Sequence, residues 1–137
     1  MADGKSARVL TQEAHNAPLT VTEEWHGPAA THSRELKSSP PGRAFTSAST
    51  SRHAIEPRTD PLIHEKRQFA RYIAELMNAA ARDKRFRRLV LVAPAKTLGD
   101  LRVGLDAAAS RLVGAEIPHD HIHTPPDELL QHLGDAL

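Results

Sequence analysis

The 137 residues suffice for one domain with one hydrophobic core, but not for two comfortable cores. A formal net charge of +1 excludes a global field that would attract nucleic acid or membrane, so a charged partner needs a local cluster. The absence of cysteine excludes disulfides, thiolate catalysis and cysteine-ligated metal centres. No apolar run approaches the roughly 20 residues of a membrane helix, and no secretory h-region is present. We therefore expect a cytoplasmic protein with no membrane partner.

Two short runs rich in β-branched residues open the chain, at residues 7–12 and 19–26. The residues between them, His15-Asn16-Ala17-Pro18, are typical of a turn, so the pattern predicts an antiparallel hairpin. Apolar and polar residues alternate imperfectly in the second run, which indicates an edge or half-exposed strand.

From residue 38 to residue 60 the composition changes to serine, threonine, proline, glycine and arginine. Such a segment buries too little apolar surface to offset its ordering entropy, so we expect a long flexible loop. Loops of this length are either functional or merely soluble connections. The candidate contacts for an anion or an RNA backbone in this loop are Arg43, Arg52, His53 and Arg58.

The clearest helix signal follows the loop. Asp60 is a good N-cap, Pro61 fits the first helical position, and an apolar stripe runs through residues 62–80. Residues 89–93 (LVLVA) have no polar face, which predicts a strand covered on both sides, as central parallel strands are.

Three shorter elements complete the chain. Thr97 is predicted to cap a helix in which Gly99 permits close packing on a sheet. Residues 113–117 read as a strand, and Thr124 is predicted to cap the last helix. The order of elements indicates an α/β fold: a single domain over residues 1–137 with a mixed sheet and covering helices.

Four segments in order along nearly the whole chain carry a family resemblance: ADGKSARVL, PGRAFTSASTSRHAIEPRTDP, RLVLVAPAKTLGDLR and GAEIPHDHIHTPPDEL. In these segments the chain resembles the bacterial host-attachment proteins, also described as proteins required for attachment to host cells. The resemblance implies an RNase H-like fold, similar to the middle domain of archaeal and eukaryotic peptide-chain release factors. It implies a role in attachment or, alternatively, binding to the ribosome or tRNA in translation, ribosome rescue or hibernation. The Gly-Gly-Gln motif of release factors is absent.

The chain departs from this family at two places. Family members usually begin with an apolar strand that ends in Ala-Asp-Gly, whereas this chain begins Met1-Ala2-Asp3-Gly4. We therefore expect the N-terminal strand to be missing, either because the start site is misassigned or because the domain lacks it. The exposed sheet edge left behind would allow two copies to associate. Residues 49–51 (STS) also replace the usual glycines before Arg52-His53, which restricts the loop backbone.

Five cations within seven residues follow the long helix: Arg82, Lys84, Arg85, Arg87 and Arg88. One interpretation is a solvated group of charges that favours the helix C-terminus. The alternative is a phosphate-contacting patch, which is larger if Lys66, Arg67 and Arg71 share its surface. Phe86 is the only aromatic residue in the cluster, so base stacking has little support.

Histidines recur at positions 119, 121 and 123, a spacing that would align three imidazoles for zinc on an extended strand. Pro118 indicates a loop instead, so we expect solvated or helix-capping histidines and no metal or cofactor. The sequence lacks the metalloprotease, phosphate-loop and nucleophile-elbow motifs. We expect no catalytic residue and a binding protein, with a hydrolase that uses His53 or Asp120 as the third hypothesis.

Overall fold

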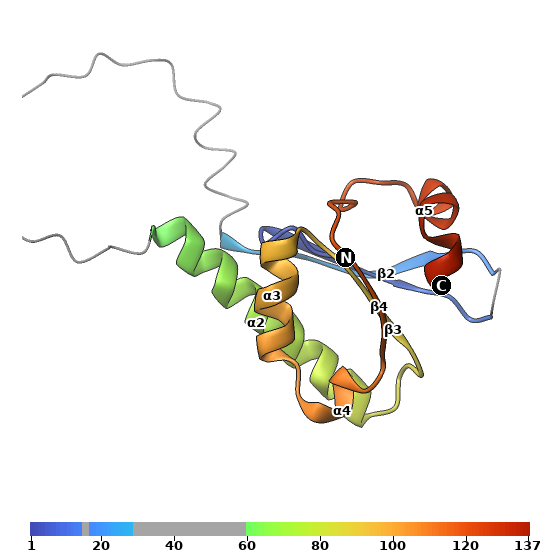
Figure 1. Ribbon diagram of the computed structural model, residues 1–137, viewed down its shortest axis with the longest axis horizontal. Helices are drawn as coiled ribbons and strands as arrows, with labels where there is room; N and C mark the ends of the chain where they lie inside the picture. Colours follow the sequence, from blue (N-terminus) through green and yellow to red (C-terminus); the bar gives the residue numbers. More distant parts are fainter. Residues whose placement is uncertain (15–16, 29–59) are drawn as a thin grey trace, which may run out of the picture.

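The fold alternates strands and helices along the chain. The computed structural model describes residues 1–14, 17–28 and 60–137. Its elements are β1 (Ser6–Thr11), β2 (Thr20–His26), α2 (Pro61–Arg82), β3 (Leu89–Val92), α3 (Ala95–Gly104), α4 (Ala107–Ser110), β4 (Val113–Ile117), α5 (Pro126–Leu133) and the 3₁₀ turn η1 (Gly134–Ala136). Figure 1 shows α2 and α3 on one side of the strands and α5 on the other. The described residues therefore form a small single-domain α/β protein with two small sheets and four helices.

The strands do not form the one mixed sheet that the sequence predicts. β1 and β2 pair antiparallel, which confirms the predicted hairpin, and β3 and β4 pair parallel in a second sheet. Met1 and Ala2 lie between the two sheets and hydrogen-bond to both of them. Arg8 N–H donates to the Met1 carbonyl over 2.9 Å, and Ala2 N–H donates to the Val92 carbonyl over 3.0 Å. The two sheets are thus connected by backbone at one end only among the described residues.

Two apolar clusters cover the two faces of the strands. On the α2 and α3 side, the buried residues include Phe69, Ile73, Leu91 and Leu101. On the α5 side, Leu129 and Leu133 pack with Val92 and Leu19. Because successive residues of a strand point to opposite faces, β3 contributes to both clusters. This confirms the prediction that residues 89–93 are covered on both sides.

Helix α2 begins and ends with recognisable caps. Asp60 accepts a hydrogen bond from the Leu62 amide over 3.0 Å, as predicted for an N-cap. At the other end, Lys84 N–H donates to Ala81 and Arg85 N–H to Ala80, the paired bonds of a Schellman motif. This motif needs a left-handed residue, and Lys84 supplies it with φ of 55°. None of the helices in residues 60–137 or the other described ranges has the length and apolarity to cross a membrane.

Three local predictions were wrong. Helix α3 begins at Ala95 after Pro94, so Thr97 is buried inside the helix instead of capping it. A Cβ on Gly99 would touch nothing within 4 Å, whereas a Cβ on Gly104 would lie 2.7 Å from that of Ala74. Close helix packing therefore needs the glycine at the end of α3. Pro125, and not Thr124, precedes the first turn of α5.

Candidate functional site

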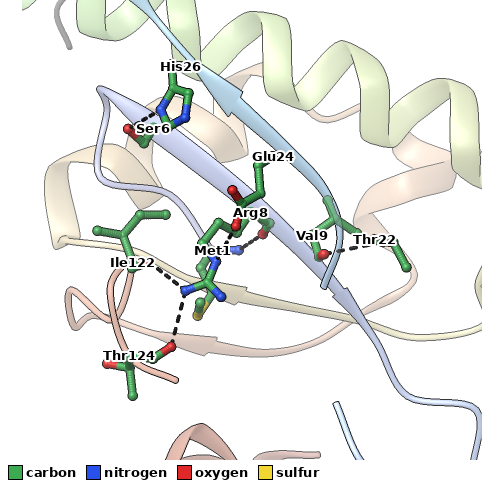
Figure 2. A network of polar contacts seen from close by, with 9 residues as sticks. All are labelled: Met1, Ser6, Arg8, Val9, Thr22, Glu24, His26, Ile122 and Thr124. Atoms are coloured by element: carbon green, nitrogen blue, oxygen red, sulfur yellow. Dashed lines mark hydrogen bonds and ion pairs between the residues drawn. The ribbon is translucent and has the colours of Figure 1, made fainter. Parts of the chain in front are cut away.

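The Arg8 side chain joins three separate parts of the chain, as Figure 2 shows. Its Nη1 donates to the carbonyl oxygens of Ile122 over 2.8 Å and Thr124 over 3.2 Å. Its Nε lies 3.1 Å from a carboxylate oxygen of Glu24 on β2. The side chain is only 16% exposed, so these contacts are poorly screened by water. Arg8 thus fixes the segment before α5 against the hairpin.

The histidine-bearing segment that Arg8 fixes is a loop, as the sequence predicts. Asp120 accepts a hydrogen bond from the Ile122 amide, and His121 Nδ1 lies 3.2 Å from the Thr124 hydroxyl. The His121 ring stacks on His132 of α5 at a centroid distance of 5.4 Å, while His123 is exposed. In the described ranges no three metal-ligating side chains gather around one point.

The basic cluster is divided between structural contacts and free charges. Arg82 pairs with Asp106 at 3.4 Å, and Arg85 pairs with Glu23 at 3.1 Å. Arg88 donates to the carbonyl oxygens of Ala136 and Leu137, over 2.9 and 2.8 Å. Two of the predicted five cations, Lys84 and Arg87, are exposed and have no polar partner among the described residues.

The cations at the start of α2 do not extend this cluster. Arg71 and Arg82 are eleven residues apart on the same helix, which is roughly 16 Å along the axis. The Debye length at physiological salt is about 8 Å, so the two groups act separately on an external charge. Arg67 also lies 3.7 Å from Asp100. The larger basic surface considered from the sequence is therefore not formed.

The loop candidates Arg43, Arg52, His53 and Arg58 all lie outside the described residues. Their suggested contact with an anion or RNA stays a prediction.

A cavity lies between the two sheets, and we call it the slot. It has a volume of about 980 Å³. β1 and β3 line its sides, and residues of α2 and α5 line its faces, among them Leu10, Val90, Met77, Leu129 and Leu133. Met1 also lines the slot. The cavity therefore begins where the backbone connection between the sheets stops.

The Met1 amine is buried beside this slot. It donates to the Arg8 carbonyl oxygen over 2.7 Å, opposite the bond from Arg8 N–H to Met1. Burial, with a smaller contribution from the Arg8 charge, lowers the pKa of the amine from 8.0 to about 5. The amine is thus neutral near pH 7, and the bond to Arg8 is one between neutral backbone groups.

Three aspartates, among them the hydrolase candidate Asp120, accept hydrogen bonds from backbone amides. Asp3 accepts from the amides of Lys5 and Ser6, each over 2.7 Å, and so forms a turn at Asp3-Gly4. Asp60 and Asp120 likewise accept from amides two residues on. The arrangement of the described residues is suited to holding segments together and to offering a groove.

Sequence reasoning missed the two features that organise this region, Arg8 and the slot. Arg8 is one arginine in a strand, and its partners Ile122 and Thr124 are more than a hundred residues away and offer only carbonyl oxygens. The apolar strand residues gave a partial signal for the slot, since a strand covered on both faces needs neighbours on both edges.

A family model described as "Protein required for attachment to host cells" matches residues 1–133. Neither the search of curated proteins nor the search of solved structures found a match. The family match takes in every strand, the Arg8 contacts, the basic cluster and the residues that line the slot up to Leu133. It covers nearly the whole chain. The chain therefore belongs to the family of proteins required for attachment to host cells.

Proposed function

We propose that this protein supports the attachment of bacteria to host cells as a binding or regulatory protein and not as an enzyme. The family match supports the role in attachment. We prefer binding to catalysis because the polar side chains already have partners within the protein. Arg8 donates to two carbonyl oxygens, Asp120 accepts from an amide, and Arg85 is paired with a carboxylate. Side chains held in this way are poorly placed to transfer protons or attack a substrate.

We propose further that the role is indirect and that the protein acts inside the bacterium on factors that mediate adhesion. Detection of an epitope-tagged protein on the surface of intact cells would overturn it.

An adhesion assay tests the proposed function. The gene is deleted in the bacterium that carries it, and binding to cultured host cells is counted with and without complementation. The wild-type gene should restore adhesion, and so should a variant with Val103→Lys on the exposed face of α3. The variant Arg8→Ala should restore less, because the loop before α5 loses its anchor. Unchanged adhesion after deletion would reject the proposal.

We also propose that the strands and helices form a variant of the RNase H-like fold in which the sheet is divided into two. The contacts of Met1 and Ala2 with both sheets support this reading. A crystal structure that superposes on RNase H-like domains with the same strand order and helix placement would support it, and one with a different strand order would not.

A role at the ribosome is the second hypothesis that the family resemblance suggests, and no comparison supports it. The contacts of the basic cluster weaken it, because Arg82, Arg85 and Arg88 are engaged within the chain. Co-sedimentation with ribosomes at low and high salt is the test. Salt-sensitive association that is lost in a Lys84→Glu, Arg87→Glu variant would revive the hypothesis.

A further inference from the structure

The ten-residue helix α3 begins with free backbone amides and no group that balances them. Its first helical hydrogen bond runs from the Leu98 amide to the Pro94 carbonyl, over 3.0 Å. The preceding amides, of Ala95, Lys96 and Thr97, therefore have no partner within the helix. Pro94 makes no side-chain cap, and the first turn holds no acidic residue. The start of α3 thus keeps the positive end of its helix dipole uncompensated.

The other three helices of the described ranges begin differently. Asp60 caps α2 and Asp106 caps α4, each through a side-chain oxygen. Helix α5 carries Asp127 and Glu128 in its first turn. Each of these helices brings a carboxylate to its own amino end, where negative charge is favourable. Helix α3 is therefore the one whose start has most to gain from an external anion.

The charge that α3 does carry in its first turn has the unfavourable sign. Lys96 is the second residue of the helix and is exposed. A cation at this position is repelled by the helix dipole. Lys96 has no polar partner in the part of the chain that the structure describes, and Asp100, four residues on, is paired with Arg67 at 3.7 Å. An anion in front of the first turn would offset both the dipole and the lysine.

A buried hydroxyl is an independent sign of a ligand at this place. Thr97 is only 8% exposed, yet its side chain forms no hydrogen bond within the described residues. Buried polar groups are rarely left unpaired. Because the Cα–Cβ bonds of a helix tilt toward its amino end, the Thr97 side chain is directed toward the free amides of the first turn. A ligand with acceptor oxygens there would satisfy the hydroxyl and the amides together.

The position of α3 in the fold also suits a ligand. The helix follows β3, and β3 runs parallel to β4. Ala93 N–H donates to the Ile117 carbonyl over 3.1 Å, so the two strands end at the same edge of their sheet. In open α/β sheets, ligands bind beyond the carboxyl ends of the strands. Ala95 and Lys96 are exposed at this edge, so the first turn is accessible.

The kind of donor at this place selects a phosphate group. Backbone amides, a hydroxyl and an ammonium group all donate, and a phosphate group offers three acceptor oxygens and a charge of nearly −2. A Lys-Thr pair at the start of a helix also ends the phosphate-binding loop of many nucleotide-binding proteins. This chain has no glycine-rich loop before α3 that could surround a second phosphate. The site therefore fits one phosphate group and not a di- or triphosphate.

We propose that the first turn of α3 binds a single phosphate group, either as the inorganic ion or as part of a small monoester. The amides of Lys96 and Thr97, the Thr97 hydroxyl and the Lys96 ammonium group are its donors. This site goes beyond the proposed function, because a protein that supports attachment by binding does not need a phosphate ligand to do so.

The test titrates the full, isotope-labelled chain with inorganic phosphate or with glycerol phosphate. Sodium chloride at equal ionic strength is the control salt, and amide resonances report the place of binding. Thr97→Val removes the hydroxyl and keeps the volume, whereas Thr97→Ser keeps the hydroxyl. Thr20→Val, at an exposed position of β2, and Lys84→Gln, beyond the end of α2, are the matched controls. Circular dichroism and melting curves establish that each variant is folded.

We expect saturable shifts of the Lys96 and Thr97 amides with a dissociation constant of about 1 mM, as two or three hydrogen bonds to a charged group provide. Thr97→Val should weaken binding about tenfold, and Thr97→Ser should keep most of it. Lys96→Gln should weaken binding about threefold, as expected for an exposed charge. The two control variants should bind like the wild type. Tighter binding of glycerol phosphate would support the site with a monoester as its ligand, and tighter binding of inorganic phosphate would support it with the free ion.

Several results would overturn the proposal. These are equal shifts with chloride and with phosphate, no saturation at about 50 mM phosphate, and unchanged binding by a folded Thr97→Val variant. If that variant does not fold, Lys96→Gln and the first-turn amides decide. Shifts confined to the turn around Lys84 would place the anion at the basic cluster and reject the site at α3. Absent phosphate binding together with a clear adhesion defect on deletion would reject this site and keep the proposed function.

Discussion

The parallel pair β3–β4 and the hairpin β1–β2 are each two strands wide, but they are attached to the domain in different ways. Leu91 and Val92 of β3 are buried between the helices on either face. β2 has no buried residue along its length. Ala7 and Trp25 of the hairpin pack on the α2 cluster and Leu10 packs on the α5 cluster, while polar contacts of Met1, Arg8 and Glu23 attach the hairpin to its surroundings. We therefore expect proton uptake and polar substitutions on the hairpin side to change the stability of the protein. On the helical side, we expect changes in side-chain volume to do so.

The largest expected effect comes from the Met1 amine. In a protein that begins at Met1, the folded-state pKa of this base is about 5, against 8.0 when unfolded. Between these values the unfolded state binds more protons, so stability falls as the pH is lowered from 8 to 5. The amine contributes a loss of about 4 kcal/mol over that window, at about 1.4 kcal/mol for each pH unit. Urea unfolding at several pH values, followed by Trp25 fluorescence, measures it.

N-terminal acetylation is the matched control, because it removes this titration and leaves every side chain unchanged. The acetylated protein should lose much less stability between pH 8 and pH 5 than the free-amine protein does. Parallel pH profiles of the two proteins would show that the amine is not the cause.

The second effect is the loss of the Arg8 anchor. Arg8→Ala removes the charged donor of the Ile122 and Thr124 carbonyls and the partner of Glu24. We expect a loss of about 3 kcal/mol in the free energy of unfolding, because hydrogen bonds to charged groups exceed neutral ones. Arg111→Ala, at an exposed position, should change it by less than about 0.5 kcal/mol. Equal losses of stability in the two variants would show that Arg8 does not anchor the loop before α5.

A pair of glycines in α3 tests the helical side. Gly104→Ala places a Cβ 2.7 Å from Ala74, and overpacking of this kind costs about 1–3 kcal/mol. Gly99→Ala enters open space in the same helix and should stabilise it by up to about 1 kcal/mol. In thermal melts, the melting temperature should fall for Gly104→Ala and rise for Gly99→Ala. A stabilising Gly104→Ala would mean that α2 and α3 are packed less tightly than their contacts indicate.

Elements marked by local signals were predictable from the sequence. Asp60 and Pro61 marked the start of α2 because capping depends only on neighbouring residues. The apolar run at 89–93 marked β3 because burial on both faces leaves no polar position. Thr97 misled because Pro94, which precedes α3, has the fixed φ that suits a helix start just as well.

Features that depend on distant partners were not predictable. The basic cluster looked uniform in the sequence, yet Asp106 and Glu23 neutralise Arg82 and Arg85 from other elements. Asn78 gave no signal either, although its buried amide bonds to the Gly104 carbonyl and the Asp106 amide and so ties α2 to the end of α3. Hydrogen bonds to backbone groups leave no complementary residue type in the sequence.

The smallest expected effect lies at Lys84, in the turn between α2 and β3. The Schellman motif there requires a left-handed residue, and Lys84 adopts φ of 55°, where a side chain is strained and glycine is not. Lys84→Gly should raise the free energy of unfolding by about 0.5–1 kcal/mol, because the strain of a Cβ at positive φ disappears. Lys84→Ala is the control for loss of the charge, since it keeps the Cβ, and it should leave stability nearly unchanged. If alanine stabilised the protein as much as glycine did, repulsion among the neighbouring cations, and not backbone strain, would be what destabilises this turn. The turn would then respond to charge, as the hairpin side of the molecule does.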